Sequence, residues 1–101
     1  MPIEAKSGLG APVAVIKRNG TAATFQAAKI VDALASAGRA TGEFGQDRAQ
    51  ALAAQVVATL ARRVPTVEQV QDQVERTLSQ AGHFDTARAY IVYREQRQML
   101  R

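Results

Sequence analysis

Two short runs of small and β-branched residues open the patterned part of the chain. Residues 13–18 and 21–25 form these runs, and Asn19-Gly20 lies between them. Such a pair between apolar runs is a strong hairpin signal, because both residues tolerate the positive φ of a tight turn. A lone hairpin is marginally stable in water, so we expect it to pack over one end of another structure.

Further along, apolar residues recur at helical spacing. The first stripe begins at Ala27 and predicts a helix that ends near Gly38. We expect Asp47 to cap a second helix, with Arg62 and Arg63 in its last turn, where cations favour the helix dipole. The two stripes are Ala27, Ile30, Leu34 and Ala37, then Ala49, Leu52, Ala53, Val56, Val57 and Leu60.

Two more helices follow. Thr66 and Gln69 have capping-box spacing at the start of the third helix, and Gly82 is a plausible stop. Asp85 is expected to cap the last helix, which runs toward Leu100 and is apolar nearly all round in its middle. We therefore expect it to be central in the bundle. The third stripe is Val67, Val70, Val74, Leu78 and Ala81.

These elements predict an α+β, mostly helical fold, in which an N-terminal β-hairpin lid packs on a four-helix bundle. The chain of 101 residues has room for one domain. Residues 1–12 contain Pro, Gly and Ser without periodicity, so we expect a flexible leader. The domain is then expected to cover residues 13–101.

The composition argues against most kinds of catalysis. The chain has no cysteine and one histidine, which excludes disulfides, thiolate chemistry and multi-histidine metal sites. The carboxylates read mostly as helix caps or solvated faces, including the i, i+3 pair Asp72 and Glu75. We therefore expect no enzyme activity. No signal or membrane segment is evident, so the expected location is the cytoplasm.

The charge favours anionic ligands. The formal net charge is +4 and the isoelectric point is about 10.1, which suits phosphates on nucleotides or nucleic acids. Lys17 and Arg18 adjoin the turn, and Lys29 lies in a first helical turn, where a phosphate would offset its unfavourable dipole interaction. For Lys17 and Arg18 taken alone, a solvated hairpin tip is the favoured interpretation. A small nucleic-acid-binding module is the alternative, using Arg94, Arg97 and Arg101 on one helix face.

Three blocks, in this order, carry a family resemblance. They are residues 15–20 (VIKRNG) with Phe25 and Lys29-Ile30, residues 65–68 (PTVE) with Gln71-Asp72 and Val74-Glu75, and residues 87–94 (ARAYIVYR). Together they resemble the ATP-cone family. Their sequences are most similar to the N-terminal regulatory cone of bacterial, anaerobic-type ribonucleoside-triphosphate reductases.

The resemblance implies a regulatory domain that binds ATP or dATP, with Mg²⁺, between the lid and the helices. Such a domain controls ribonucleotide reductase through nucleotide-dependent assembly. The expected partners are an adenine nucleotide, a reductase in cis or in trans, and a second copy of the chain, with neither membrane nor nucleic acid. A free-standing cone acting as an interaction scaffold remains an alternative. The nucleotide-binding residues implied by the resemblance are Lys17, Arg18, Gly20, Lys29, Thr66, Gln71 and Arg94.

Overall fold

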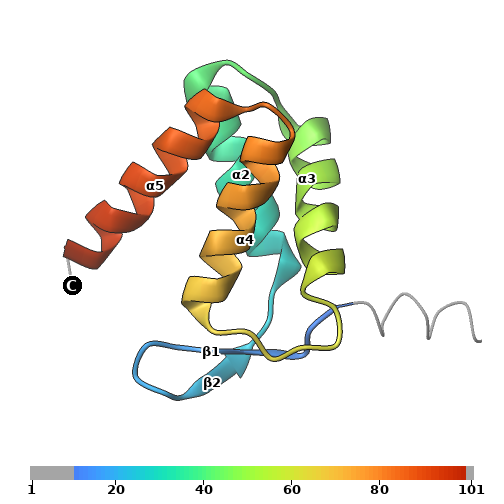
Figure 1. Cartoon of the computed structure of the whole chain (residues 1–101), viewed down its shortest axis with the longest axis vertical. Coiled ribbons are helices and arrows are strands. Elements are labelled where there is room, and N and C mark those ends of the chain that lie inside the picture. Colours follow the sequence, from blue (N-terminus) through green and yellow to red (C-terminus); the bar gives the residue numbers. More distant parts are fainter. Residues whose placement is uncertain (1–10, 100–101) are drawn as a thin grey trace, which may run out of the picture.

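The computed structural model describes residues 11–99, in which a two-stranded hairpin precedes four helices (Figure 1). This arrangement confirms the predicted α+β, mostly helical fold. The expected leader lies outside the described residues apart from Ala11 and Pro12, and Pro12 is buried. The elements are β1 (Ala14–Ile16), β2 (Ala22–Thr24), α2 (Ala27–Thr41), α3 (Gln46–Thr59), α4 (Val67–Gln80) and α5 (Phe84–Met99).

The hairpin is antiparallel, with Val15 opposite Ala23. Asn19 organises the connection, because its Oδ1 accepts hydrogen bonds from the amide and the hydroxyl of Thr21, at 3.1 and 2.7 Å. Gly20 has a φ of 87°, a value that glycine adopts without the strain that a Cβ would add. The Asn-Gly signal therefore predicted the hairpin and the place of its turn, although of the pair only Gly20 has a positive φ.

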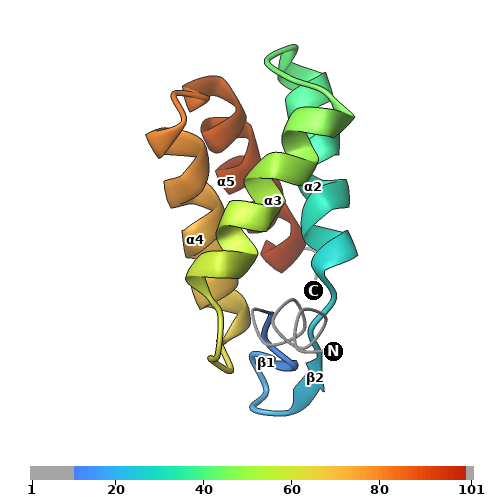
Figure 2. The same ribbon diagram turned by 90° about the vertical axis from the view of Figure 1, so that its right-hand side faces the viewer.

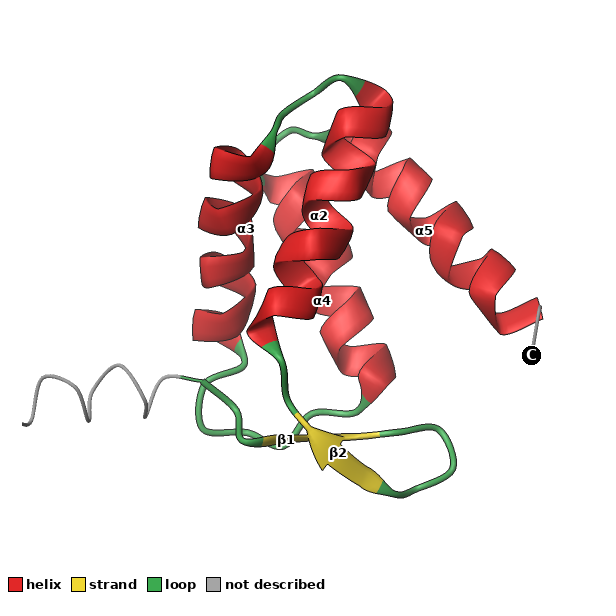
Figure 3. Cartoon of the chain, turned by 180° about the vertical axis from the view of Figure 1, so that it is seen from behind, coloured by secondary structure: helices red, strands yellow, loops and turns green. Residues whose placement is uncertain are grey.

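The hairpin is tied to the start of α4. The amide of Ile16 donates to the carbonyl of Pro65 at 2.8 Å, and Ile16 forms a parallel bridge with Thr66. The predicted capping box is present: Thr66 Oγ1 accepts from the amide of Gln69, whose side chain accepts from the amide of Thr66. The hairpin thus crosses the lower end of the helices, as expected (Figures 1 and 3).

The core lies between the four helices, and the predicted apolar stripes supply most of it. Leu34, Leu52 and Leu78 are fully buried, one each from α2, α3 and α4. Figure 2 shows α3 crossing in front of α2 and α5, with α4 alongside. No helix within residues 11–99 combines the length and hydrophobicity that crossing a bilayer requires.

The first helix is longer than predicted. α2 continues through Gly38 to Thr41, and Gly42, with φ 78°, provides the left-handed C-cap instead. Gly38 has a packing role, because a Cβ there would lie 2.3 Å from the ring of Phe44. The prediction that Gly38 ends the helix was therefore wrong.

The ends of α3 also differ from prediction. Its N-cap is Gly45, and Asp47 lies inside the first turn, where it still interacts favourably with the helix dipole. The helix ends at Thr59, so Arg62 and Arg63 lie beyond it and not in its last turn. Arg62 has a φ of 64°, a left-handed conformation outside the helix.

α5 is not the central helix of the bundle. It contacts α2 and α4 and leans away from α4 toward its C-terminal end (Figure 1). It begins at Phe84, so Asp85 lies in its first turn and does not cap it. Ile91, Val92 and Tyr93 are exposed, because only one side of the helix meets the bundle. Between residues 84 and 96, the side chains that α5 buries are Thr86, Ala87 and Tyr90.

Candidate functional site

A cavity of about 900 Å³ lies above the hairpin, between α2, α4 and α5. Figure 1 shows that α5, one of the helices that line it, diverges from the other helices toward its C-terminal end. We call it the hairpin cavity. Its lining residues are Val15, Lys17, Arg18, Ala23, Thr24, Phe25, Gln26, Lys29, Ile30, Asp32, Ala33, Ser36, Ala37, Ala40, Val67, Val70, Gln71, Ala89, Tyr90, Tyr93 and Arg94.

Two lysines line the cavity without a salt-bridge partner among residues 11–99. Lys17 follows β1, Lys29 lies in the first turn of α2, and both are exposed. α2 has no acidic residue in its first turn, so nothing there offsets the unfavourable interaction of Lys29 with the helix dipole. An anion between these lysines would gain from both charges.

Arg18 also lines the cavity, but it is already paired. Its Nη1 lies 2.9 Å from Oε2 of Glu68, in the first turn of α4. Both side chains are more than a third exposed, at 45% and 39%. An exposed ion pair of this kind is worth at most about 1 kcal/mol. A phosphate can therefore replace the carboxylate on Arg18 at little cost.

Arg94 is held far more firmly. Its Nη1 donates to Oδ1 of Asp72 at 3.2 Å and to Oε2 of Glu75, and its side chain is only 15% exposed. Burial alone would lower the pKa of Arg94, but the bonds to Glu75 and Asp72 outweigh it and raise the pKa. Two carboxylates thus neutralise this cation. Arg94 therefore links α5 to α4.

Much of the wall away from the cations is apolar, although the carboxylate residue Asp32 of α2 also lines it. Ala33, Ala37 and Ala40 succeed one another along α2, and Tyr90 faces them from α5. Burial raises the pKa of Tyr90 to about 12, so this phenol stays neutral at physiological pH. A cavity with cations at one end and small apolar side chains at the other fits a ligand with an anionic and a planar apolar part.

Five of the seven residues implied by the resemblance line the hairpin cavity: Lys17, Arg18, Lys29, Gln71 and Arg94. Gly20 lies at the hairpin tip, outside the lining. Thr66 is also outside it, because its hydroxyl caps α4 and its backbone joins β1.

The family model of the ATP cone domain matches residues 13–99. The chain belongs to the ATP cone family.

Relatives of this cone are ribonucleotide reductases. A vitamin B12-dependent ribonucleoside-diphosphate reductase from Mycobacterium tuberculosis is 38% identical over 93% of the chain, and one from Thermoplasma acidophilum is 37% identical over 86%. The alpha subunit of a ribonucleoside-diphosphate reductase from Chlamydia muridarum is 37% identical over 88%. The chain spans only 14%, 12% and 10% of these three proteins. All three names specify diphosphate reductases, whereas the resemblance noted from the sequence was to the triphosphate type.

Sequence reasoning missed the acidic row of this cone. Glu68, Asp72 and Glu75 were interpreted as caps or solvated faces, but they hold Arg18 and Arg94. Their i, i+4, i+7 spacing puts them on one face of α4, and this spacing is the signal that could have identified them. Their partners come from the hairpin and α5, so they connect three elements around the hairpin cavity.

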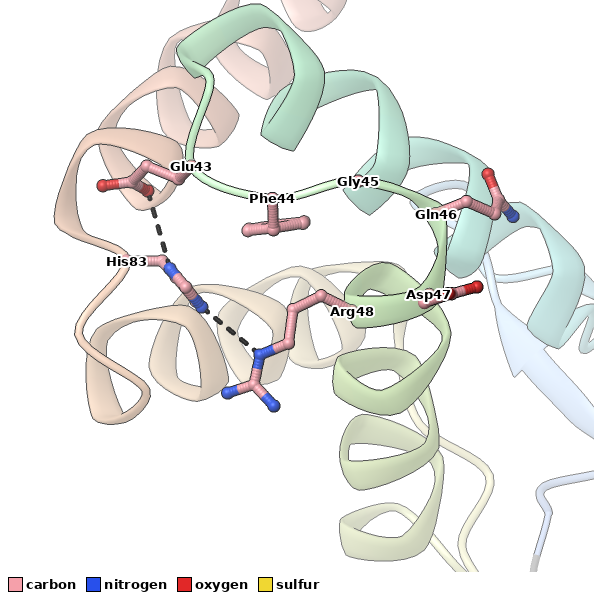
Figure 4. A pocket seen from close by; sticks show the side chains of 7 residues that line it. All are labelled: Glu43, Phe44, Gly45, Gln46, Asp47, Arg48 and His83. Carbon is pink, nitrogen blue, oxygen red and sulfur yellow. Dashed lines mark hydrogen bonds and ion pairs between the residues drawn. The ribbon is translucent and has the colours of Figure 1, made fainter.

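A second, open pocket of about 570 Å³ lies at the other end of the cone, around His83 (Figure 4). Nδ1 of His83 is 3.9 Å from Oε1 of Glu43, and Nε of Arg48 donates to Nε2 of His83 at 3.5 Å. The rings of Phe44 and His83 are 4.8 Å apart. These contacts join the α2–α3 loop to the start of α5, and we interpret the cluster as structural.

Glu43 anchors that cluster to the core. Its Oε1 accepts hydrogen bonds from the hydroxyl and the amide of the fully buried Thr86, at 2.6 and 3.0 Å. The hydroxyl bond is the main reason that the pKa of Glu43 lies below its usual value. Residues 11–99 contain no group of three or more acidic, His or Cys side chains arranged to hold a metal ion.

Proposed function

We propose that this cone binds ATP and dATP as effectors in the hairpin cavity. The observation that carries the proposal is that Lys17 and Lys29 line the same cavity as the alanines of α2. Both lysines lack ion-pair partners among the described residues. The lysines would hold the phosphates, with Arg18 joining them once it leaves Glu68. Mg²⁺ would arrive with the phosphates. Residues 13–101 would form the binding domain, with residues 1–12 as a leader.

The proposed role is regulation without turnover. The relatives are reductases of which this chain spans only a small part, so we propose that the cone acts on a ribonucleotide reductase in cis or in trans. The nucleotide would change how the cone assembles, with the reductase or with a second copy. The chain's own part is to bind the effector and transmit its presence through the hairpin and α5.

The nucleic-acid alternative loses support from the geometry. It required Arg94 to contact phosphates together with Arg97 and Arg101, but Arg94 is held between Asp72 and Glu75. Arg101 lies outside the described residues. The structure therefore gives no observation that favours this alternative over a mononucleotide.

Thermal unfolding with ligands tests the proposal. A nucleotide at 100 times its Kd adds about 2.7 kcal/mol of stability, which raises the Tm of a domain this size by roughly 10–20 °C. We expect such shifts with Mg-ATP and Mg-dATP, and smaller ones with Mg-GTP and Mg-pyrophosphate, at both low and high salt. Tm shifts that are equal for all four ligands and disappear at high salt would show that the ligands bind only to a basic patch by charge.

A further inference from the structure

One buried polar atom in the hairpin cavity has no partner. Oε1 of Gln71 is shielded from solvent and accepts no hydrogen bond from any residue between 11 and 99. A buried carbonyl oxygen without a donor costs folding free energy, so native proteins rarely keep one without a reason. A ligand that supplies the donor is such a reason.

The position of Gln71 indicates which part of a ligand would reach it. Gln71 is one helical turn beyond Val67 on α4, and both line the cavity. One turn corresponds to about 5.4 Å along the helix, so Gln71 lies away from the hairpin that carries Lys17. The apolar side chain of Val70 and the aromatic ring of Tyr90 line the same cavity. A base in this part of the cavity would have its phosphates directed toward the lysines.

We propose that Gln71 accepts a hydrogen bond from the 6-amino group of the adenine base and thereby selects adenine nucleotides. The inference rests on the proposed function and adds the contact that reads the base. A glutamine amide presents an acceptor beside a donor, which matches the amino group and the neighbouring ring nitrogen of adenine. A base without the amino group leaves the oxygen orphaned, and this unmet hydrogen bond is the source of selectivity.

The test compares three nucleotides by isothermal titration calorimetry. They are ATP, dATP and purine riboside triphosphate, which lacks only the 6-amino group. Wild-type protein is expected to bind the last about 5–100-fold more weakly than ATP, the range for one unmet buried hydrogen bond. Gln71→Met, of similar volume, is expected to bind ATP as weakly as the analogue. Gln80→Met is the matched control, because Gln80 is an exposed glutamine of α4 outside the cavity.

Stability supplies a second readout that does not depend on the ligand. Removing an unpaired buried oxygen should raise the Tm of nucleotide-free Gln71→Met by roughly 4–8 °C over wild type. A lower Tm would show that the amide is already satisfied, and would overturn the proposal.

The binding outcomes are equally decisive. Equal binding of ATP and the analogue by wild type would overturn the assignment. Weaker binding of dATP than of ATP, with the analogue unaffected, would also overturn it, since the donor to Gln71 would then be the 2′-hydroxyl. If neither wild type nor Gln80→Met binds any of the three nucleotides, the proposed function itself fails, and the role of Gln71 with it.

Discussion

Arg18 Nη1 lies 2.9 Å from Glu68 Oε2, so a single ion pair joins the hairpin to the first turn of α4. The same arginine lines the hairpin cavity, where the proposed phosphates would lie. Glu68 therefore occupies the position of a competitor: whatever anion binds Arg18 must displace this carboxylate.

Removing that competitor should strengthen binding. Glu68→Gln is expected to raise the affinity for ATP up to about fivefold, because an exposed ion pair is worth at most about 1 kcal/mol. Calorimetric titration at low salt measures the effect. Glu95→Gln is the control, because it removes an equal charge from an exposed position on α5 outside the cavity. Weaker binding by Glu68→Gln than by this control would contradict the competition.

Lys29 offers a separation of binding from stability. Lys29→Ala should weaken ATP binding by about 1.5–3 kcal/mol if the ammonium bonds a phosphate. The same change should leave the free protein equally or slightly more stable, since it removes a cation from the first turn of α2. Titration and urea unfolding check the two effects. Arg76→Ala, an exposed change on α4, controls for net charge, and binding as weak as that of Lys29→Ala would argue against a specific contact.

Arg94 should behave in the opposite way. Arg94→Met leaves Glu75 without its main partner, and Glu75 is only 22% exposed. We expect a loss of about 1–3 kcal/mol in the free energy of unfolding, measured by urea titration. Adding Glu75→Gln should restore part of that loss, because the uncompensated charge is then gone. A stable Arg94→Met that binds no ATP would instead make Arg94 a phosphate ligand.

The Glu43 anchor predicts a pH dependence. The pKa of Glu43 is lower in the folded protein than its ordinary value of 4.5, so its contribution is complete above that value. It is lost as the pH falls through the folded pKa. The difference in unfolding free energy between wild type and Glu43→Gln should therefore shrink below about pH 4.5. A difference that grows on acidification would refute this sign.

The sequence pattern predicted the parts of the fold that depend on local chemistry. The Asn19-Gly20 turn and the Thr66 capping box involve neighbours within a few residues, so their signals are complete in the sequence. The end of α2 was mispredicted because Gly38 receives the ring of Phe44, a tertiary contact that no local rule contains. α5 was misplaced because its apolar content does not say which of its sides meets the bundle.

The candidate site divides in the same way. The residue types at Lys17 and Lys29, and their places beside a turn and in a first helical turn, are compatible with a phosphate ligand, although a solvated hairpin tip also explains Lys17. The pairing of Arg94 with Glu75 could not be predicted, because it joins residues of two helices at a distance set by packing. Nor could the orphaned oxygen of Gln71, which exists only once the surrounding side chains shield it.

The central claim is that ATP binds in the hairpin cavity, and amide chemical shifts of the ¹⁵N-labelled protein test it most directly. Titration with Mg-ATP should perturb amides of the hairpin, of the first turn of α2 and around Gln71 and Tyr90, while those around His83 stay in place. Perturbations centred on Glu43, Arg48 and His83, or none at all, would contradict the account.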